Sequence, residues 1–395
     1  MSKFPNHKEA ELIGRRPTWA EIDLDALAAN FQIVRERVGP DILVMAVVKA
    51  NAYGHGAVAC ARRLAVAGAD WFGVATPEEG IELRDARLTQ PVLCLGGFWE
   101  GQASAFIQQR LVPVVYRVNM VQALDDAARS AGVVADVHVK IDTGMGRLGV
   151  RFDEAGDFAQ RLTRFRNIRV AGLMTHLAAA DDRSCEPLTI NQVQRFAAAE
   201  GVFRSCGFTP EHRHLANSAG VFDQPSAWGN MVRPGGVLYG LWRDVLPPLP
   251  APRADETHHF QPVMSLRSRI TMLKWVPAGE TIGYGCTYEA SRKTLVATLP
   301  IGYNDGYRRA LSNRGRAIVR GAYASVIGRV SMDLTLVDVT DVPGVELDDI
   351  VTLMGREHDH GKLMIAAEDV ARTAGTISYE VTCGVGSRVP RIYLP

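Results

Sequence analysis

The most constraining feature of this sequence is an alternation of short apolar runs with alanine-rich amphipathic stretches between residues 19 and 240. Eight of the runs have the length and composition of buried strands: 43–48, 71–75, 92–95, 111–115, 136–142, 170–175, 212–215 and 231–233. The stretches between them have helical periodicity, as in 58–67, 77–87, 121–131, 154–165 and 191–204. Eight β-then-α units favour a (β/α)8 barrel over an open sheet. We therefore expect an α/β fold with an N-terminal extension over residues 1–18 and a TIM-type barrel over residues 19–252.

The pattern changes after Trp242. Residues 244–255 contain four prolines, which predicts a hinge between domains. Beyond the hinge, glycines separate short alternating runs, and a helical pattern appears only at 365–374. This predicts a mostly β C-terminal domain over residues 253–395. Its expected strands are 264–273, 295–299, 317–320, 325–330, 335–339 and 350–354.

Composition excludes several classes of protein. The 44 Lys and Arg residues balance 43 Asp and Glu residues, so no net field attracts a polyanion, and we expect no nucleic-acid partner. No run approaches the roughly 18 apolar residues of a membrane span, and the first residues lack the apolar core of a signal peptide. The six cysteines are scattered without paired spacing, which argues against a metal site and a disulfide framework. A cytoplasmic protein without a metal or a membrane partner is the expectation.

The run ILVMAVVKANAYGHG at 42–56 leads through apolar residues to Lys49. This lysine would stand at the carboxyl end of a strand, where α/β folds place their chemistry. One interpretation is a lysine that extends from the strand end to water. The other is an amine whose partly apolar surroundings lower its pKa, so that it can form a Schiff base. Gly54 and Gly56 then let the chain turn into a helix, whose N-terminus favours an anion.

Four further motifs bring polar residues to predicted strand ends. They are HVKIDTGMGRLGV, GLMTHLAAADD, HRHLANSAGVF and NMVRPGGVLYG. Each has a structural interpretation: a salt bridge, a structural histidine or a serine N-cap. The motifs that contain Arg147, Ser218 and the Gly235–Gly236 pair also suit an anionic ligand, because arginine binds oxyanions as a fork and a helix N-terminus or bare glycine backbone can approach a phosphate. The residues concerned are Lys140, Arg147, His176, Asn217, Ser218, Arg233, Gly235 and Gly236.

In this order the motifs resemble those of the alanine racemase family, which are barrel-type enzymes that use pyridoxal 5'-phosphate (PLP). The resemblance runs from about residue 19 to the C-terminus. It implies that Lys49 carries the cofactor and that Arg233 faces the pyridine nitrogen, where a permanent cation discourages ring protonation. It also implies that Arg147 approaches the substrate carboxylate and that a carbamate on Lys140 holds this arginine. The remaining residues implied to surround the cofactor are Tyr53, His176, Asn217, Ser218, Gly235, Gly236 and Tyr379.

The resemblance extends into the C-terminal domain. There the motif TIGYGCTYEA contains Tyr284, which would be the second base on the face opposite Lys49. The motif IGRVSMDLTLVDV contains Met332 and Asp333, implied to bind substrate, and IGYNDGY contains Tyr303, implied to narrow the entrance with Tyr379. Two positions depart from the usual pattern of the family: Asn304 replaces a common alanine, and Gly236 replaces a larger apolar residue.

The implied activity is the interconversion of L- and D-alanine by two bases, Lys49 and Tyr284, in a homodimer with shared active sites. Such an enzyme would supply D-alanine for peptidoglycan or catabolise it. Three alternatives stay open at this point. A racemase of broad, serine or lysine specificity has the same motifs, a barrel-type decarboxylase shares the fold, and a non-catalytic PLP-binding protein would lack the β domain and Tyr284.

Overall fold

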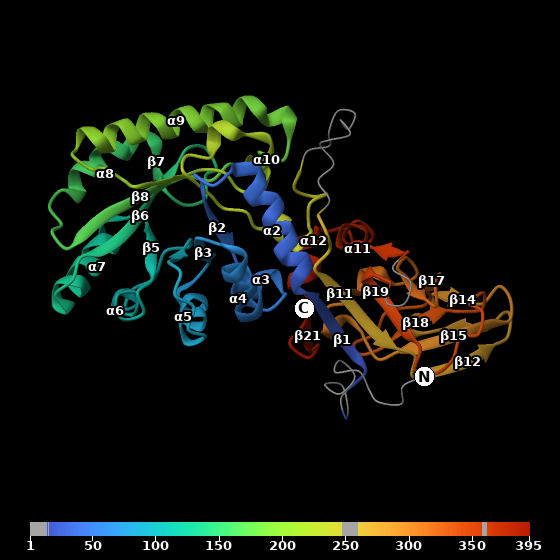
Figure 1. The fold of residues 1–395 in the computed structure, drawn as a ribbon. Helices are drawn as coiled ribbons and strands as arrows, with labels where there is room; N and C mark the ends of the chain where they lie inside the picture. The colour runs from blue at the N-terminus through green and yellow to red at the C-terminus, as the bar shows by residue number, and fades with distance from the viewer. Residues whose placement is uncertain (1–13, 15, 247–259, 358–361) are drawn as a thin grey trace. The chain divides into compact units, whose positions relative to one another are not determined.

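The computed structural model describes residues 14, 16–246, 260–357 and 362–395. The chain divides into two compact units. The barrel unit comprises residues 27–238 together with 242–246 and 260, and the β unit comprises the other described residues. Both units are drawn as ribbons in Figure 1. Most of the hinge expected at 244–255, and most of the extension expected at 1–18, lie outside the described residues.

Eight parallel strands form a nearly closed barrel in the order β10-β2-β3-β4-β5-β6-β8-β9. Each expected strand is present within a few residues of its predicted position, which confirms the barrel fold. A further two-residue strand, β7 (Val150–Arg151), pairs only with β6. The barrel strands are β2 (Leu43–Val47), β3 (Trp71–Val74), β4 (Val92–Cys94), β5 (Val112–Val115), β6 (Ala135–Asp142), β8 (Ile168–Met174), β9 (His212–His214) and β10 (Met231–Val232).

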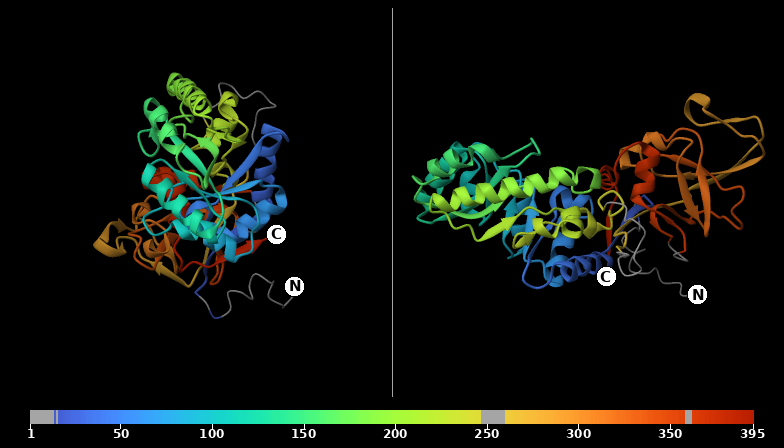
Figure 2. Two further views of the ribbon diagram at one scale, coloured as in Figure 1. Left: turned by 90° about the vertical axis from the view of Figure 1, so that its left-hand side faces the viewer. Right: turned by 90° about the horizontal axis from the view of Figure 1, so that it is seen from above.

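Helices follow the strands and cover the barrel from outside, as the views in Figure 2 show. Inside, six strands each contribute one side chain to a single buried cluster, and this packing excludes water from the barrel centre. The cluster consists of Met45, Trp71, Leu93, Val114, Met174 and Met231. The helices are α2 (Leu24–Val38), α3 (Lys49–Tyr53), α4 (Ala57–Ala67), α5 (Pro77–Asp85), α6 (Ala103–Gln108), α7 (Val118–Ala131), α8 (Ala155–Leu162), α9 (Glu186–Ser205) and α10 (Ser218–Asp223).

The β unit is built on a ten-stranded sheet with the order β12-β15-β18-β17-β16-β19-β11-β1-β21, with β20 paired to β19. This confirms the mostly β C-terminal domain. Two short helices, α11 (Ala367–Ala374) and α12 (Ser378–Cys383), and the separate hairpin of β13 (Thr281–Ile282) and β14 (Tyr288–Glu289) complete it. The strands of the large sheet are β1 (Thr18–Asp23), β11 (Met264–Arg269), β12 (Met272–Val276), β15 (Thr294–Leu299), β16 (Arg316–Val319), β17 (Ala322–Val326), β18 (Thr335–Asp338), β19 (Ile350–Arg356), β20 (Met364–Ile365) and β21 (Arg391–Leu394).

Strand β1 differs from the expected domain boundaries. Residues 19–23 were expected in the barrel, but β1 pairs antiparallel with β11 and parallel with β21 in the β unit. A buried ion pair holds it there, with Arg267 Nε 3.0 Å from Glu21 Oε2. Its partners lie some 240 or more positions away in sequence, so local patterns carry no information about which sheet it joins.

Two expected strands have different limits in the structure. The run 264–273 is interrupted, because β11 ends at Arg269 and β12 begins at Met272. The strand expected at 325–330 begins earlier, as β17, and ends at Val326. Among the described residues no helix is both long enough and apolar enough to cross a membrane.

Candidate active site

Lys49 is half-buried and lies two residues after the last residue of strand β2, at the strand end that the sequence predicted. The four residues after it, Ala50, Asn51, Ala52 and Tyr53, all have φ between 52° and 54°. Left-handed backbone costs a non-glycine residue about 1–2 kcal/mol, so four in succession need support from their surroundings. A single left-handed turn thus joins the candidate lysine to Tyr53.

Side-chain contacts supply that support. Glu79 on α5 accepts the backbone N–H of Ala50 at 2.7 Å and, with its other oxygen, that of Ala75 at 2.7 Å. Asn51 accepts the backbone N–H of Ala57 at 2.7 Å, which ties the turn to the first residue of α4. The carboxylate of Glu79 therefore joins the turn after Lys49 to the end of the next barrel strand.

A second group of candidates surrounds the backbone of Gly235. The Ser218 hydroxyl accepts the N–H of Gly235 at 2.9 Å, and a Cβ added to Gly235 would lie 2.4 Å from the Tyr53 hydroxyl. Asn217 is the N-cap of α10, where its Oδ1 accepts the N–H of Gly220 at 3.0 Å. Gly236 is buried and begins the next 3-10 turn. The hydroxyls of Tyr53 and Ser218 thus both lie beside the backbone of Gly235, at a position where a larger residue would collide with Tyr53.

Arg233 is 3% exposed and has no carboxylate among its hydrogen-bond acceptors in the described chain. Its guanidinium donates to the carbonyls of Thr175 (2.7 Å), His214 (2.7 Å) and Leu215 (3.0 Å). It also donates to His176 Nδ1 at 3.2 Å. Burial lowers the pKa of Arg233 to about 9, so it remains a cation at neutral pH.

A chain of imidazoles extends from this arginine into the barrel. Arg233 Nη1 lies 2.9 Å from His214 Nδ1, and His214 Nε2 lies 2.8 Å from His138 Nδ1. Burial lowers the pKa of both histidines, that of His138 to about 3, so both rings are neutral. Because a guanidinium can only donate, the proton of His214 must lie on Nε2 and that of His138 also on Nε2. The same argument gives His176 a protonated Nε2, since its Nδ1 accepts from Arg233.

Lys140 lies on β6 and is 5% exposed. Burial, followed by the charges of Arg233 and Arg147, lowers its pKa to about 8. Arg147 is exposed in the loop after β6. Asp142 orders this loop by accepting the backbone N–H groups of Gly144 and Met145 at 3.0 and 2.9 Å. Lys140 and Arg147 are therefore near enough to influence each other electrostatically, as the motif suggested.

Four of the candidates of the β unit line one pocket of about 470 Å3. Tyr284 enters it from the tip of the β13–β14 hairpin, between two glycines with φ of 77° and 72°. Tyr303, Met332 and Asp333 line the same pocket together with Arg309 and Arg329, which sequence analysis did not select. Tyr284 is 73% exposed, so the pocket is open on its side.

Two loops of this pocket are fastened to each other. Asn304 donates its backbone N–H to the carbonyl of Met332 at 3.1 Å, and a Cβ at Gly302 would lie 2.3 Å from the Ser331 carbonyl. Asp333 receives Arg388 Nη2 at 2.8 Å. The exposed side chain of Asn304 is therefore held beside Met332 through its backbone. Tyr379 lies on α12 and does not line this pocket.

Sequence analysis missed several residues that organise the candidates. Glu79 and Arg309 stand in none of the quoted motifs, while His138 begins the motif of Lys140 but received no role. Glu79 and His138 contact residues far away in the chain, and Arg309 lines the pocket of Tyr284. His214 was noted in its motif but received no role. Of these residues, Glu79 alone has a recognisable sequence signal, because it follows the N-cap Thr76 by three residues. That spacing is typical of a capping box and does not by itself indicate a contact with the turn after Lys49.

Lys49 is a half-buried lysine at a barrel strand end, and the Tyr53 hydroxyl, the Ser218 hydroxyl and the backbone of Gly235 form a phosphate cradle. Together they define a barrel-type enzyme equipped for a phosphorylated aldehyde cofactor. The model of the "Alanine racemase, N-terminal domain" matches residues 22–242, and that of the "Alanine racemase, C-terminal domain" matches residues 263–393. The chain belongs to the alanine racemase family. It is thus an amino acid racemase, an isomerase that depends on PLP.

Relatives and solved structures agree with this assignment. The chain is 43% identical to the alanine racemase of Halothermothrix orenii over 380 residues, which covers 96% of this chain and 97% of the relative. It is also 43% identical to that of Geobacter sulfurreducens, over 96% of this chain and 97% of the relative. The crystal structure of the Streptomyces lavendulae alanine racemase matches with a TM-score of 0.87 at 35% identity, covering 96% and 97% of the two chains. That of Streptomyces coelicolor A3(2) matches with a TM-score of 0.87 at 37% identity, covering 96% and 98%.

The residues present fit PLP. A phosphate needs hydroxyl and backbone N–H donors and room for its oxygens, and the cradle of Tyr53, Ser218 and Gly235 offers a site that a single Cβ would obstruct. The carbonyl group of the cofactor needs a primary amine, which Lys49 provides. Arg233 offers only N–H donors to a ring acceptor.

Proposed function

We propose that this racemase interconverts L- and D-alanine with two bases, Lys49 on one face of the substrate and Tyr284 on the other. The single observation that carries the proposal is that the chain contains both a half-buried lysine at a barrel strand end and an exposed tyrosine held between two glycines. The relatives at 43% identity over nearly the whole chain are alanine racemases, which supports alanine as the substrate. When bound, PLP supplies an electron-withdrawing group that makes the α-hydrogen of the amino acid acidic.

Residues of this chain would then remove the α-proton and return a proton to the α-carbon. Inversion requires that one group remove the α-proton and another deliver a proton to the opposite face. Lys49 Nζ exchanges the proton of D-alanine, and Tyr284 Oη exchanges that of L-alanine. Tyr303 and the backbone of Met332 restrict and orient the substrate, while Arg147 and Asp333 complete its polar surroundings.

Arg233 and the histidines hydrogen-bonded to it keep the ring nitrogen of the cofactor from being protonated. The guanidinium donates to its acceptors and holds its own proton at neutral pH. His176 and His214 are neutral, because burial and the charge of Arg233 lower their pKa values well below the ordinary range. A pyridine nitrogen of PLP that faces Arg233 would therefore receive a hydrogen bond but no proton. This favours rapid return of a proton to the α-carbon of the substrate.

We propose further that the active enzyme is a homodimer in which the partner subunit's Tyr284 completes the barrel site of Lys49. Tyr284, Met332 and Leu334 are 73%, 52% and 44% exposed and line the same pocket. Large apolar side chains gathered on a surface favour a protein partner. We also propose a cytoplasmic location, supported by six free cysteines, of which Cys60 and Cys94 are fully buried.

Racemisation of L-alanine in D2O tests the two-base mechanism. With two bases, D-alanine formed early in the reaction carries deuterium at Cα, since its proton comes from the second base. Tyr284→Phe should slow racemisation by about 10²-fold or more and still exchange the α-hydrogen of D-alanine without inversion. The matched control Tyr288→Phe, on the same hairpin, should keep its activity. D-alanine that retains the original hydrogen, or a faster rate on L-serine or L-lysine than on L-alanine, would contradict the proposal.

Mixed dimers test the shared site. We expect homodimers of Lys49→Ala and of Tyr284→Phe each to lose most of their activity, whereas a heterodimer of the two would contain one intact pair of bases. After verified subunit exchange, we expect about a quarter of the wild-type activity in an equimolar mixture, since half of the dimers are mixed and each regains one of two sites. A mixture that stays inactive would exclude a site shared between subunits.

A further inference from the structure

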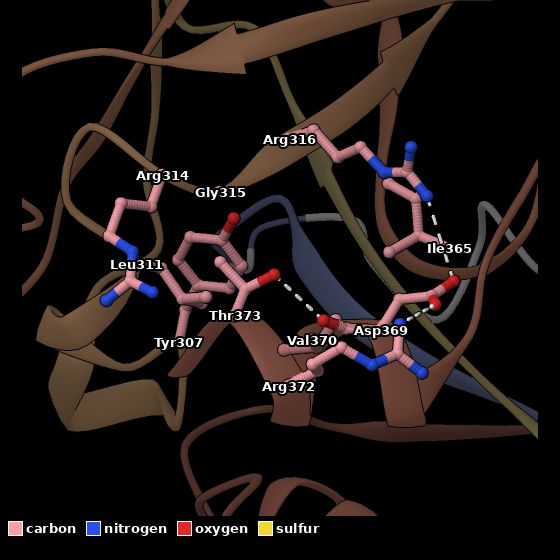
Figure 3. A pocket seen from close by; sticks show the side chains of 10 residues that line it. All are labelled: Tyr307, Leu311, Arg314, Gly315, Arg316, Ile365, Asp369, Val370, Arg372 and Thr373. Atoms are coloured by element: carbon pink, nitrogen blue, oxygen red, sulfur yellow. Dashed lines mark hydrogen bonds and ion pairs between the residues drawn. The ribbon is translucent and has the colours of Figure 1, made fainter. Parts of the chain in front are cut away.

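A second pocket of the β unit has a charge distribution unlike that of the candidate active site. It measures about 290 Å3, at the small end for ligand sites. Helix α11, strand β16, strand β20 and the turn at Arg309–Leu311 contribute to it, as Figure 3 shows. The residues lining it are Tyr307, Leu311, Arg314, Gly315, Arg316, Ile365, Asp369, Val370, Arg372 and Thr373.

The lining carries three arginines and one carboxylate. Asp369 receives a hydrogen bond from Arg372 Nη1 at 3.1 Å and lies 3.7 Å from Arg316 Nη2. It also accepts the backbone N–H of Ala366 at 3.3 Å, so its oxygens are already engaged. Arg314 is exposed, and none of the described residues pairs with its guanidinium. The formal charge of the lining is therefore close to +2, and most of the guanidinium N–H groups are open to a ligand.

The Tyr307 side chain lines the same pocket, and its hydroxyl is accessible from it. Tyr307 is 3% exposed, and no described residue makes a hydrogen bond to its hydroxyl. Gly315 leaves the hydroxyl uncovered, because a Cβ there would lie 2.9 Å from its oxygen. Burial raises the pKa of Tyr307 above its ordinary value, which keeps the phenol protonated and able to donate. The phenol can therefore donate a hydrogen bond to a ligand that enters the pocket.

We propose that this pocket binds a phosphate group, with the Arg314 guanidinium and the Tyr307 hydroxyl as its principal donors. A phosphate monoester carries a charge of about −1.5 to −2 at neutral pH, which matches the excess charge of the lining, whereas a carboxylate carries half of that. Thr373 donates its own hydroxyl proton to the Asp369 carbonyl at 2.9 Å, so its oxygen can accept a hydrogen bond from a phosphate hydroxyl or a water. Leu311, Ile365 and Val370 supply an apolar wall for a small carbon group attached to the phosphate.

This site is independent of the proposed catalysis. None of the residues lining it is a candidate catalytic or cofactor-binding residue. The turn Arg309–Leu311 contributes to both pockets, since Arg309 lines the pocket of Tyr284 and Leu311 lines this one. Occupancy of the phosphate site would therefore restrain a turn that also borders the candidate active site.

Calorimetric titration of the PLP-loaded enzyme with inorganic phosphate, in a phosphate-free buffer, tests the proposal. The cofactor fills its own phosphate cradle, so saturable binding of one phosphate per chain is expected at the second pocket. Arg314→Gln should weaken binding by about tenfold or more, and Tyr307→Phe by about threefold to tenfold. The matched control Arg166→Gln, an exposed arginine of the barrel unit, should leave binding unchanged.

Two further arms make the result decisive. Glycerol 3-phosphate shows whether the ligand is free phosphate or a phosphate monoester, because the apolar wall favours the latter. Acetate should bind at least tenfold more weakly than phosphate.

Tyr307→Phe removes a hydroxyl without a partner among the described residues and should fold with an unchanged or higher melting temperature. No saturable binding, equal weakening in Arg166→Gln, or acetate binding as tight as phosphate would overturn the proposal. None of these outcomes depends on racemase activity.

Discussion

Glu79 accepts the backbone N–H of Ala50, the residue directly after Lys49, with 2.7 Å between Oε1 and the nitrogen. The other oxygen of the same carboxylate accepts Ala75 N–H at 2.7 Å. One side chain of α5 thus fixes the backbone beside the candidate catalytic lysine relative to strand β3. The four left-handed residues that follow Lys49 make this support necessary, because each prefers another conformation when it is free.

Replacing Glu79 should therefore loosen the lysine turn. Glu79→Gln retains only one acceptor atom, so one of the two backbone N–H groups loses its hydrogen bond. Because neither group is fully buried, we expect the free energy of unfolding to fall by about 0.5–1.5 kcal/mol. The turnover number should fall as well, because Lys49 loses its fixed position. Urea denaturation and racemase assays measure both effects. Glu78→Gln is the matched control, since Glu78 is exposed and, within the described part of the chain, accepts only from Gln102. Equal behaviour of the two variants would refute the role of Glu79.

Gly235→Ala should obstruct the phosphate cradle. The new Cβ would lie 2.4 Å from the Tyr53 hydroxyl, a distance at which one of the two must move. We expect the dissociation constant for PLP to rise by about tenfold or more, as measured by absorbance titration of the apoenzyme. Gly201→Ala provides the control, because a Cβ at this position of α9 meets nothing within 4 Å and alanine favours the helix. Unchanged PLP affinity in Gly235→Ala would show that the cradle does not hold the phosphate.

The buried imidazoles predict a loss of stability in mild acid. The pKa of His138 is about 3 in the folded chain and about 6.5 when unfolded, so the unfolded state binds the proton first as pH falls. Its contribution is fully present above pH 6.5 and is lost as the pH falls towards 3, at about 1.4 kcal/mol per pH unit. His138→Asn, whose Oδ1 can still accept from His214, should have a correspondingly shallower slope. Denaturation at pH 7, 6 and 5 measures it, and identical slopes would contradict the prediction.

Lys140 should react with carbon dioxide. Because its pKa is lowered to about 8, about a tenth of its amine is neutral at pH 7 and can form a carbamate. The resulting anion could pair with Arg147, as the family resemblance implies. With 13C-bicarbonate we expect a carbamate resonance in the wild type and none in Lys140→Arg. Activity should fall in CO2-free buffer and return on addition of bicarbonate. A wild-type spectrum without the resonance would leave Lys140 an ordinary amine.

Much of the fold follows from short-range patterns. The eight barrel strands were predictable because each is a compact apolar run with a turn signal at its end, and burial in a parallel sheet demands that pattern. Lys49 stood out for a related reason, since it is a polar residue at the end of an apolar strand, whereas the roles of Arg233 and Tyr284 came from the resemblance to the family. Residue order alone was thus sufficient for the barrel, the second domain, the family and the candidate bases.

Other features depend on contacts that no local pattern encodes. Strand β1 joins a sheet whose other strands begin some 240 residues later, Glu79 reaches back 29 residues to Ala50, and His138 meets His214 across 76 positions. Pairing of this kind is decided by long-range packing in the folded chain. The protonation of the imidazoles and the low pKa of Lys140 depend on burial for the same reason, since desolvation is a property of the folded interior and not of the chain.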